Sequence, residues 1–320
     1  MGDALDAARQ RIAAGPGADR IAGHLRDRYG LQVRGLDQLD LGVYRVDQAG
    51  GPPWVVRVFP AARPGSAAAG DASILRLLAE RDFPAERLAA EEPVSVLDGR
   101  SVLVTRFVPG VPRTERAEVV RAGGGLRRLG ELLAELSTFP GVSRSGGAWH
   151  HLTDGTPADE IRASRALLAA GPAPTGALHD MLARELAEAD GGEGLAEGLI
   201  HPDFVLANVI ASASEGLVLV DWTGAGHGPR AWPLAFLLYA EGARNPGRAE
   251  LVVSGYRRRV TLEDEEIERL PAMMRVRPVV LAAWSFCLGR ISAEQAARAV
   301  ASARQVAEAV GPRVVAAFRA

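Results

Sequence analysis

Polar residues interrupt an apolar stretch in the second half of the chain. The segment HPDFVLAN (201–208) places a histidine, an aspartate and an asparagine between the apolar pairs 199–200 and 209–210. A second aspartate, Asp221, follows the next apolar run. Taken alone, these residues also suit a turn followed by a helix cap. Their combination allows more, because loops at strand ends can aim polar side chains without burying them.

The residue types match the needs of phosphoryl transfer. An aspartate such as Asp203 can accept the proton of an attacking hydroxyl, while Asn208 and Asp221 can supply oxygen ligands to Mg²⁺. Magnesium usually completes its shell with water and substrate phosphates, so two protein ligands from one hairpin are about what it requires. The spacing therefore predicts a magnesium-dependent phosphoryl-transfer site.

The elements that must position this site begin with a strand-rich first third. Segments rich in β-branched and aromatic residues are 31–36, 43–48, 54–59 and the two arms of 93–110. Turn signals at 49–53 and at Asp98 and Gly99 predict two hairpins. An apolar helical face marks 70–83, and two short helices are expected within residues 1–30. This order predicts a small antiparallel sheet with a helix packed on it.

The rest of the chain has a mainly helical pattern. Amphipathic segments separated by glycine- and proline-rich joints are 126–139, 158–171, 176–192, 263–270 and 292–310. The exception is a predicted hairpin over 209–222, which directly follows the polar motif. The composition changes near 108–112. We therefore expect an α+β fold with two lobes, residues 1–110 and 111–320.

Composition narrows the class of protein. The chain of 320 residues has a formal net charge of −2, which gives no electrostatic reason to bind nucleic acid or an anionic membrane. No apolar run approaches the roughly 18–20 residues of a membrane-spanning helix, and the first residues do not read as a signal peptide. The single cysteine, Cys287, excludes an intrachain disulfide and suits a reducing cytoplasm, which is the expected location.

The chain contains no lysine, so all 37 of its Lys and Arg residues are arginines. A Walker A loop needs a lysine for its phosphate contact, and a pyridoxal enzyme needs one for its Schiff base. Both of these mechanistic classes are therefore excluded.

With these elements in place, the chain resembles the aminoglycoside phosphotransferase and choline kinase-like family, small-molecule relatives of protein kinases. His201, Asp203 and Asn208 have the spacing of the kinase catalytic loop H-R-D-x-x-x-x-N, and Asp221 stands where the DFG aspartate would. The resemblance covers roughly residues 35–240. It implies a bilobal protein-kinase-like fold with an N-terminal nucleotide-binding lobe and a C-terminal catalytic and substrate-binding lobe.

The resemblance also implies a role for each matching residue. Asp203 would be the catalytic base, and His201 would support the catalytic loop through hydrogen bonds. Asn208 and Asp221 would bind Mg²⁺. The acceptor pocket would be built from the helices after residue 112.

Further residues would bind the nucleotide. Gly42 and Val43 match the hairpin that covers it, and Thr105 and Phe107 match the hinge strand against which the adenine lies. Arg57, held by Asp71 of the following helix, would contact the α- and β-phosphates. Taken singly, Arg57 could also be a strand arginine on a solvated face, and Asp71 an acid favoured near a helix N-terminus.

The sequence departs from the family pattern at several positions. Arg57 replaces the usual lysine, so the phosphates would be clasped by a planar guanidinium. Pro229 and Pro233 stand where relatives carry acids that support the catalytic loop, so either another residue steadies the loop or the loop is looser than usual. His227 could face the substrate cleft.

We therefore expect a kinase that moves the γ-phosphate of ATP or GTP to a hydroxyl of a small molecule, such as an antibiotic, a sugar, an amino alcohol or a secondary metabolite. One alternative is a pseudokinase-like module that binds a nucleotide or a partner without transfer. Another is a metal-dependent hydrolase with His201, Asp203 and Asp221 as ligands, which leaves the first hundred residues unexplained. The acceptor, the choice between ATP and GTP, and the oligomeric state stay open.

Overall fold

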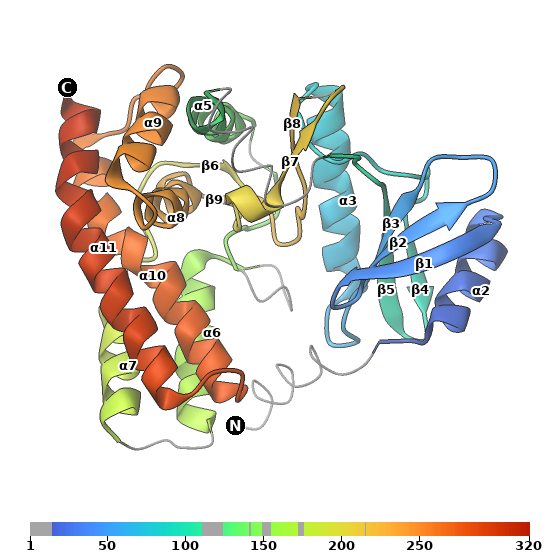
Figure 1. Cartoon of the computed structure of the whole chain (residues 1–320), viewed down its shortest axis with the longest axis horizontal. Coiled ribbons are helices and arrows are strands. Elements are labelled where there is room, and N and C mark those ends of the chain that lie inside the picture. Colours follow the sequence, from blue (N-terminus) through green and yellow to red (C-terminus); the bar gives the residue numbers. More distant parts are fainter. Residues whose placement is uncertain (1–14, 111–123, 141, 149–154, 172–175, 215) are drawn as a thin grey trace.

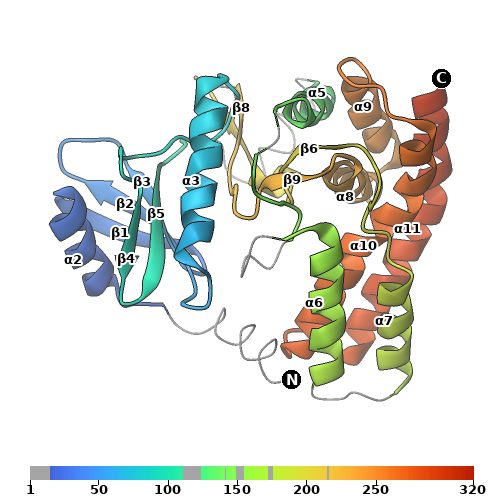
Figure 2. The same cartoon turned by 180° about the vertical axis from the view of Figure 1, so that it is seen from behind.

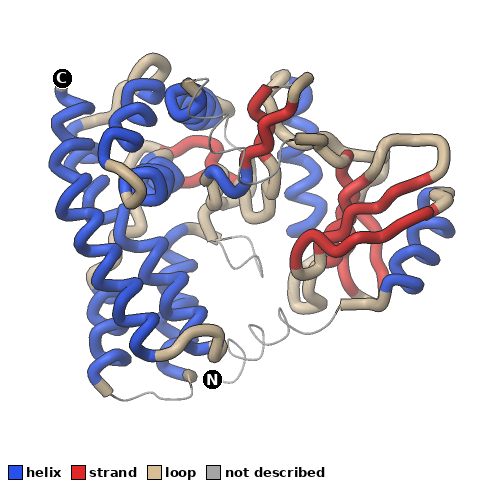
Figure 3. The backbone as a smooth tube through the Cα atoms, viewed as in Figure 1, coloured by secondary structure: helices blue, strands red, loops and turns tan. Residues whose placement is uncertain are grey.

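Two lobes of different secondary structure make up the chain (Figures 1 and 3). The structure, a computed structural model, describes residues 15–110, 124–140, 142–148, 155–171, 176–214 and 216–320. The N-terminal lobe runs from α2 (Ala18–Tyr29) to β5 (Arg100–Arg106), and the mainly helical C-terminal lobe runs from α5 (Gly125–Ser137) to α11 (Ala293–Arg319). The expected α+β, two-lobed fold class is confirmed. The division near 108–112 runs into residues outside those described, so the predicted boundaries stay predictions.

Antiparallel pairing orders the strands of the N-terminal sheet β1-β2-β3-β5-β4. The bounds of the other four are β1 (Val33–Asp40), β2 (Val43–Gln48), β3 (Trp54–Val58) and β4 (Val94–Leu97). Both predicted hairpins are present, and Asp98 and Gly99 turn the second one with φ of 50° and 74°. The first strand extends beyond the predicted 31–36, because it stays paired with β2 until Asp40 lies opposite Val43.

One helix covers each face of this sheet. Alternate residues of β5 face opposite ways, so Val102 and Val104 join a core with α2, while Leu103 joins the core that includes α3 (Gly65–Glu80). Figures 1 and 2 show α3 between the sheet and the C-terminal lobe. Gly30, with φ of 67°, ends α2 as predicted. The other helix expected within residues 1–30 falls on residues outside those described.

The C-terminal lobe is built on two long helices. Its helices are α5, α6 (Pro157–Ala170), α7 (Ala177–Ala187), α8 (Ala231–Gly242), α9 (Pro246–Tyr256), α10 (Asp264–Cys287) and α11. α10 and α11 pack along each other, with α6 and α7 beside α10 (Figure 2). α10 continues far beyond the predicted 263–270, through Pro271 and Pro278. Among the described residues, no helix is long and apolar enough to cross a bilayer.

Two small two-stranded sheets lie between these helices and α3. The predicted hairpin is confirmed as β7 (Val209–Ser212) and β8 (Gly216–Leu219). β6 (Glu197–Ile200) pairs with β9 (Gly226–Pro229), a strand that its sequence, GHGP, did not indicate. The glycines are needed for close approach, because a Cβ on Gly226 would lie 2.6 Å from the backbone of Ser145.

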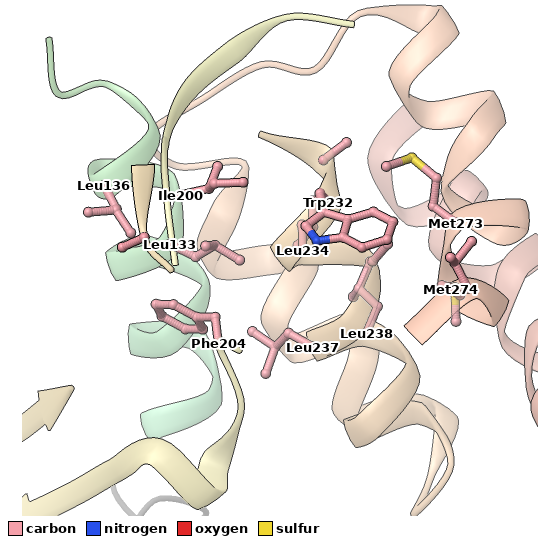
Figure 4. Close-up of a cluster of buried hydrophobic side chains, with 14 of the residues drawn as sticks. Leu133, Leu136, Ile200, Phe204, Trp232, Leu234, Leu237, Leu238, Met273 and Met274 are labelled. Atoms are coloured by element: carbon pink, nitrogen blue, oxygen red, sulfur yellow. The ribbon is translucent and has the colours of Figure 1, made fainter. Parts of the chain in front are cut away.

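The polar motif is anchored to the main core by its own apolar residue. Phe204, next to Asp203, is buried in the core that also contains Leu133 of α5 and Leu237 of α8, and Figure 4 shows its ring beside α5. On the same core, the ring of Trp222 meets that of Phe83 edge-on, with 5.8 Å between centroids. The apolar residues at 204 and 222 therefore fix the two segments whose neighbouring aspartates carry the predicted chemistry.

Candidate active site

A buried histidine joins the two segments of the site. His201 is inaccessible to solvent; its Nδ1 accepts a hydrogen bond from the backbone N–H of Asp203 (3.1 Å), and its Nε2 lies 3.2 Å from the carbonyl of Val220. Since Nδ1 accepts, the proton is on Nε2 and is donated to Val220. Burial lowers the pKa of His201, which keeps the ring neutral. The ring thus ties the Asp203 loop to the segment that leads into Asp221.

Asn208 contacts Asp203 directly. Its Nδ2 donates to both the carbonyl and the Oδ2 of Asp203, each at 2.9 Å. The carbonyl of Asn208 accepts from the N–H of Val220 at 2.9 Å, which places Asn208 beside the end of the hairpin. With its NH₂ turned toward Asp203, the amide oxygen of Asn208 points away from that carboxylate.

Asp221 adopts an unusual backbone conformation. Its φ of 68° lies in the left-handed region, which disfavours residues with a Cβ by roughly 1–2 kcal/mol. The N–H of Asp221 donates to Oε1 of Glu86 at 2.8 Å. Its Oδ1 accepts from Arg57 Nη1 at 2.8 Å and from the Thr223 hydroxyl at 3.0 Å. Strained residues of this kind cluster at functional sites.

Arg57 of β3 reaches across from the N-terminal lobe to this aspartate. Besides its bond to Asp221, its Nη2 lies 3.6 Å from Oε1 of Glu86, and only 11% of its side chain is exposed. Burial opposes the charge of Arg57, but the carboxylates of Asp221 and Glu86 outweigh it and raise the pKa of the guanidinium. Arg57, Asp221, Asn208 and Asp203 therefore form one continuous neighbourhood.

The predicted pairing of Arg57 with Asp71 is wrong. Asp71 is buried in α3, and its two oxygens bind Arg63 Nη2 and Arg144 Nη1, each at 2.7 Å. Burial raises the pKa of Asp71, while the two arginines oppose that shift. Both oxygens of Asp71 are thus engaged by these two arginines. The acid of the N-terminal lobe that lies near Arg57 is Glu86.

The predicted base is held by an arginine that the sequence did not reveal. Nη2 of Arg277, in α10, donates to Oδ1 of Asp203 at 2.7 Å, and the side chain of Arg277 is 3% exposed. Burial lowers the pKa of Arg277, against the opposing charge of Asp203. Arg277 thereby stabilises the loop that carries Asp203. Pro229 and Pro233 have no charged side chain with which to do so.

The predicted nucleotide residues fall into two groups. Val43 is paired with Arg57 across β2 and β3, and the Gly42 carbonyl accepts from the N–H of Val58 at 2.7 Å. A Cβ on Gly42, whose φ is 69°, would lie 2.6 Å from the carbonyl oxygen of Val58, so only glycine fits this turn. Gly42 and Val43 are thus brought next to Arg57.

The two hinge residues use their polar groups within the protein. Thr105 is fully buried and donates its hydroxyl to Oε2 of Glu86 at 2.8 Å, so this side chain supports Glu86 and does not face a nucleotide. The N–H of Phe107 donates to the carbonyl of Pro53 at 2.9 Å. The Arg45 guanidinium lies over the Phe107 ring, 4.7 Å from its centroid.

His227 does not approach Asp203 through any contact of the described residues. It lies in β9 opposite Leu199, and its Nδ1 is 3.0 Å from Oε2 of Glu197. A structural contact therefore accounts for this side chain.

Sequence reasoning missed Glu86 and Arg277, of which Arg277 breaks a local pattern. Arg277 occupies a position on the apolar stripe of α10 that Met273, Met274 and Val280 also share. Charged residues in such stripes are rarely buried unless they are paired, and this signal could have drawn attention to Arg277.

The donor set of this site suits magnesium. Among the described residues, no group of three or more His, Cys, Asp or Glu side chains could hold a metal by itself. The amide oxygen of Asn208 and the carboxylate of Asp221 are hard oxygen ligands, and Mg²⁺ takes its remaining ligands from phosphates and water. Asn208 and Asp221 would therefore be able to hold Mg²⁺ together with nucleotide phosphates and water.

Solved structures similar to this chain share its fold over nearly their whole length. An aminoglycoside phosphotransferase from Alicyclobacillus acidocaldarius has a TM-score of 0.64 at 16% identity, covering 92% of this chain and 95% of that one. The choline kinase LicA from Streptococcus pneumoniae has a TM-score of 0.62 at 13% identity, covering 91% and 98%. A microcompartment-associated aminopropanol kinase has a TM-score of 0.60 at 21% identity, covering 93% and 98%. The kinase-like fold is thereby confirmed.

Comparison of the sequence with protein-family profiles identifies the family. A search of curated proteins found no match. The profile of the phosphotransferase enzyme family, in contrast, matches residues 32–276, which span both lobes and every residue of the site except Arg277. The resemblance inferred from the motifs is confirmed, and the chain belongs to the phosphotransferase enzyme family.

Proposed function

We propose that this protein is a magnesium-dependent kinase that moves the γ-phosphate of ATP or GTP to a hydroxyl of a small molecule. The observation that carries the proposal is the direct contact between the predicted groups. Asn208 binds Asp203 at 2.9 Å, and Arg57 binds Asp221 at 2.8 Å. The second contact joins one residue from each lobe, 164 positions apart in sequence, and it supports a site in which both lobes contribute to phosphoryl transfer.

Each residue has a task that its surroundings support. Asp203 orients the acceptor hydroxyl and takes its proton, with Arg277 and Asn208 fixing its two oxygens. Arg57 offers two N–H groups to the nucleotide phosphates. Asn208 and Asp221 are the residues that would hold Mg²⁺, which would supply positive charge to the phosphates.

The acceptor is a hydroxylated small molecule. The similar structures are named for acting on aminoglycosides, choline and aminopropanol, which are alcohols that carry an amino or ammonium group. Amino alcohols and aminoglycosides are therefore the first acceptors to test, followed by sugars and secondary metabolites.

The first prediction tests the base. Purified protein is incubated with Mg²⁺, with ATP or GTP, and with a panel of hydroxylated compounds, and phosphorylated product is measured by mass spectrometry. Asp203→Asn should lower kcat by at least about 100-fold, because general base catalysis contributes that much, while leaving nucleotide binding nearly intact. Asp180→Asn, at a side chain that is 72% exposed in α7, is the control and should not change kcat.

Other results would point elsewhere. An Asp203→Asn variant with ordinary turnover rejects the base assignment. Tight nucleotide binding without transfer to any acceptor supports the pseudokinase-like module. Stable binding of a transition metal in the absence of nucleotide supports the metal-dependent hydrolase.

A further inference from the structure

A buried glutamate lies where the nucleotide-facing elements of the two lobes meet. Glu86 belongs to the segment between α3 and β4, and its side chain is 4% exposed. Two backbone hydrogen bonds fix this segment to β8, from Glu86 N–H to the Leu219 carbonyl (2.9 Å) and from Leu219 N–H to the Pro84 carbonyl (2.8 Å). The position of Glu86 is therefore set by the hairpin that leads into Asp221.

Within the described part of the chain, the side-chain contacts of Glu86 go to elements of the proposed site. Oε1 accepts the N–H of Asp221 at 2.8 Å and lies 3.6 Å from Arg57 Nη2. Oε2 accepts the hydroxyl of Thr105, in β5, at 2.8 Å. Burying a carboxylate is costly unless it is paired and hydrogen-bonded. The contacts with Asp221, Arg57 and Thr105 thus offset the cost of burying the Glu86 carboxylate.

The negative charge of Glu86 has a direct effect on Arg57. Arg57 is shared between Glu86 and Asp221, and Asp221 is the carboxylate that a cation or a phosphate-bound metal would compete for. When Asp221 is engaged elsewhere, Glu86 is the acid that still holds Arg57 at the end of its strand. Without that acid, Arg57 would bind Asp221 alone and would oppose metal binding there.

The contact with Asp221 fixes the backbone. Asp221 has a φ of 68°, and the hydrogen bond from its N–H to Glu86 helps to hold this conformation. The direction of the Asp221 side chain depends on this φ. One carboxylate therefore controls both the metal-binding aspartate and the phosphate-binding arginine.

We propose, on the basis of the proposed function, that Glu86 is the positioning residue for Arg57 and Asp221, and that it takes the role expected of the helix acid Asp71. Asp71 instead joins α3 to Arg63 and Arg144.

The test compares Glu86→Gln with Asp71→Asn. A glutamine side chain is the same size as glutamate, and its amide oxygen can still accept from the N–H of Asp221, so the change removes the charge and keeps the packing. Binding of ATP is measured by isothermal titration calorimetry over a range of Mg²⁺ concentrations and in EDTA, without any acceptor. Glu241→Gln is the matched control, since Glu241 is equally buried in α8 and pairs only with Arg248 in the contacts of the described residues.

Glu86→Gln should raise the Mg²⁺ concentration for half-maximal ATP binding at least fivefold, and should weaken ATP binding less in EDTA than with Mg²⁺. Glu86→Asp, which keeps the charge, should restore part of the metal dependence. Asp71→Asn and Glu241→Gln should lower the thermal midpoint of unfolding and leave the Mg²⁺ dependence as in the wild type. A general loss of packing would not change the metal dependence selectively.

An unchanged Mg²⁺ dependence in Glu86→Gln, with wild-type ATP affinity, overturns the inference while the proposed function stands. If the Mg²⁺ dependence of ATP binding changes more in Asp71→Asn than in Glu86→Gln, the positioning role belongs to the helix acid Asp71. If the wild-type protein itself binds neither ATP nor GTP with Mg²⁺, the proposed function fails, and this result is distinct from a failure of the variant alone.

Discussion

Each of the two aspartates of the site is held by an arginine from a distant element. Arg57 of β3 binds Asp221, and Arg277 of α10 binds Asp203. The second pair makes a specific prediction. Arg277→Met, which keeps an unbranched side chain but removes the guanidinium, should lower kcat about tenfold or more, equivalent to about 1.4 kcal/mol, because Asp203 loses the donor that fixes one of its oxygens.

Nucleotide affinity should separate this effect from misfolding. The Kd for ATP with Mg²⁺ should stay within about twofold in Arg277→Met, and Arg277→Lys should recover part of kcat, since it keeps a donor and a charge. Arg248→Met, which removes the buried partner of Glu241, serves as the control for losing an arginine from the C-terminal lobe. Wild-type kcat in Arg277→Met would show that Asp203 needs no such support.

The neutral, buried His201 predicts a pH dependence of stability. Its folded pKa is lowered from 6.5, so both states are neutral above pH 6.5. Below that pH, His201 binds a proton in the unfolded chain but stays neutral in the folded protein. The free energy of unfolding should therefore fall by up to about 1.4 kcal/mol per pH unit until the folded pKa is reached. Urea unfolding at pH 7.5 and 5.5 measures this loss, which should be smaller in His201→Gln than in the wild type. Equal losses in both proteins would contradict the assignment.

At the scale of elements, local patterns carried most of the fold. The hairpins at 49–53 and 98–99 and the amphipathic helices follow from turn residues and from apolar spacing, which are properties of short segments. β9 escaped because GHGP has no strand preference; it forms because Gly226 and Gly228 let the backbone of 145–146 approach closely. This strand therefore depends on a contact between segments far apart in the sequence, which no local sequence pattern can reveal.

The site divides in the same way. His201, Asp203, Asn208 and Asp221 lie on one loop and one hairpin, so their spacing predicted their meeting. The acid of the N-terminal lobe that contacts Arg57 could not be predicted, because several acids, among them Asp71 and Glu86, lie between β3 and β4 in the sequence. Which one faces Arg57 depends on how α3 and the segment after it pack, and that packing is set by residues from both lobes.

At the scale of the whole molecule, the acid on α3 serves to join the lobes. Arg144, 9% exposed, binds Asp71 at 2.7 Å and the carbonyl of Ala67 at 2.9 Å, both in the N-terminal lobe. Its own backbone carbonyl accepts the N–H of His227 at 2.8 Å, which fixes Arg144 to β9 of the C-terminal lobe. A single side chain thus links α3 to the strand that follows Asp221, in an ion pair that solvent barely screens.

This link predicts how the molecule unfolds. Arg144→Met leaves Asp71 with Arg63 as its ion-pair partner among the described residues and should lower the free energy of unfolding by about 2 kcal/mol, as expected for a lost buried charged hydrogen bond. Because the lobes lose a direct connection, urea unfolding followed by far-UV circular dichroism and by tryptophan fluorescence should no longer coincide. Arg298→Met, which breaks an exposed ion pair within α11, should change stability by less than about 0.5 kcal/mol and keep the two curves together. Coincident curves with an unchanged midpoint in Arg144→Met would show that packing between α3 and the C-terminal lobe, and not this ion pair, couples the lobes.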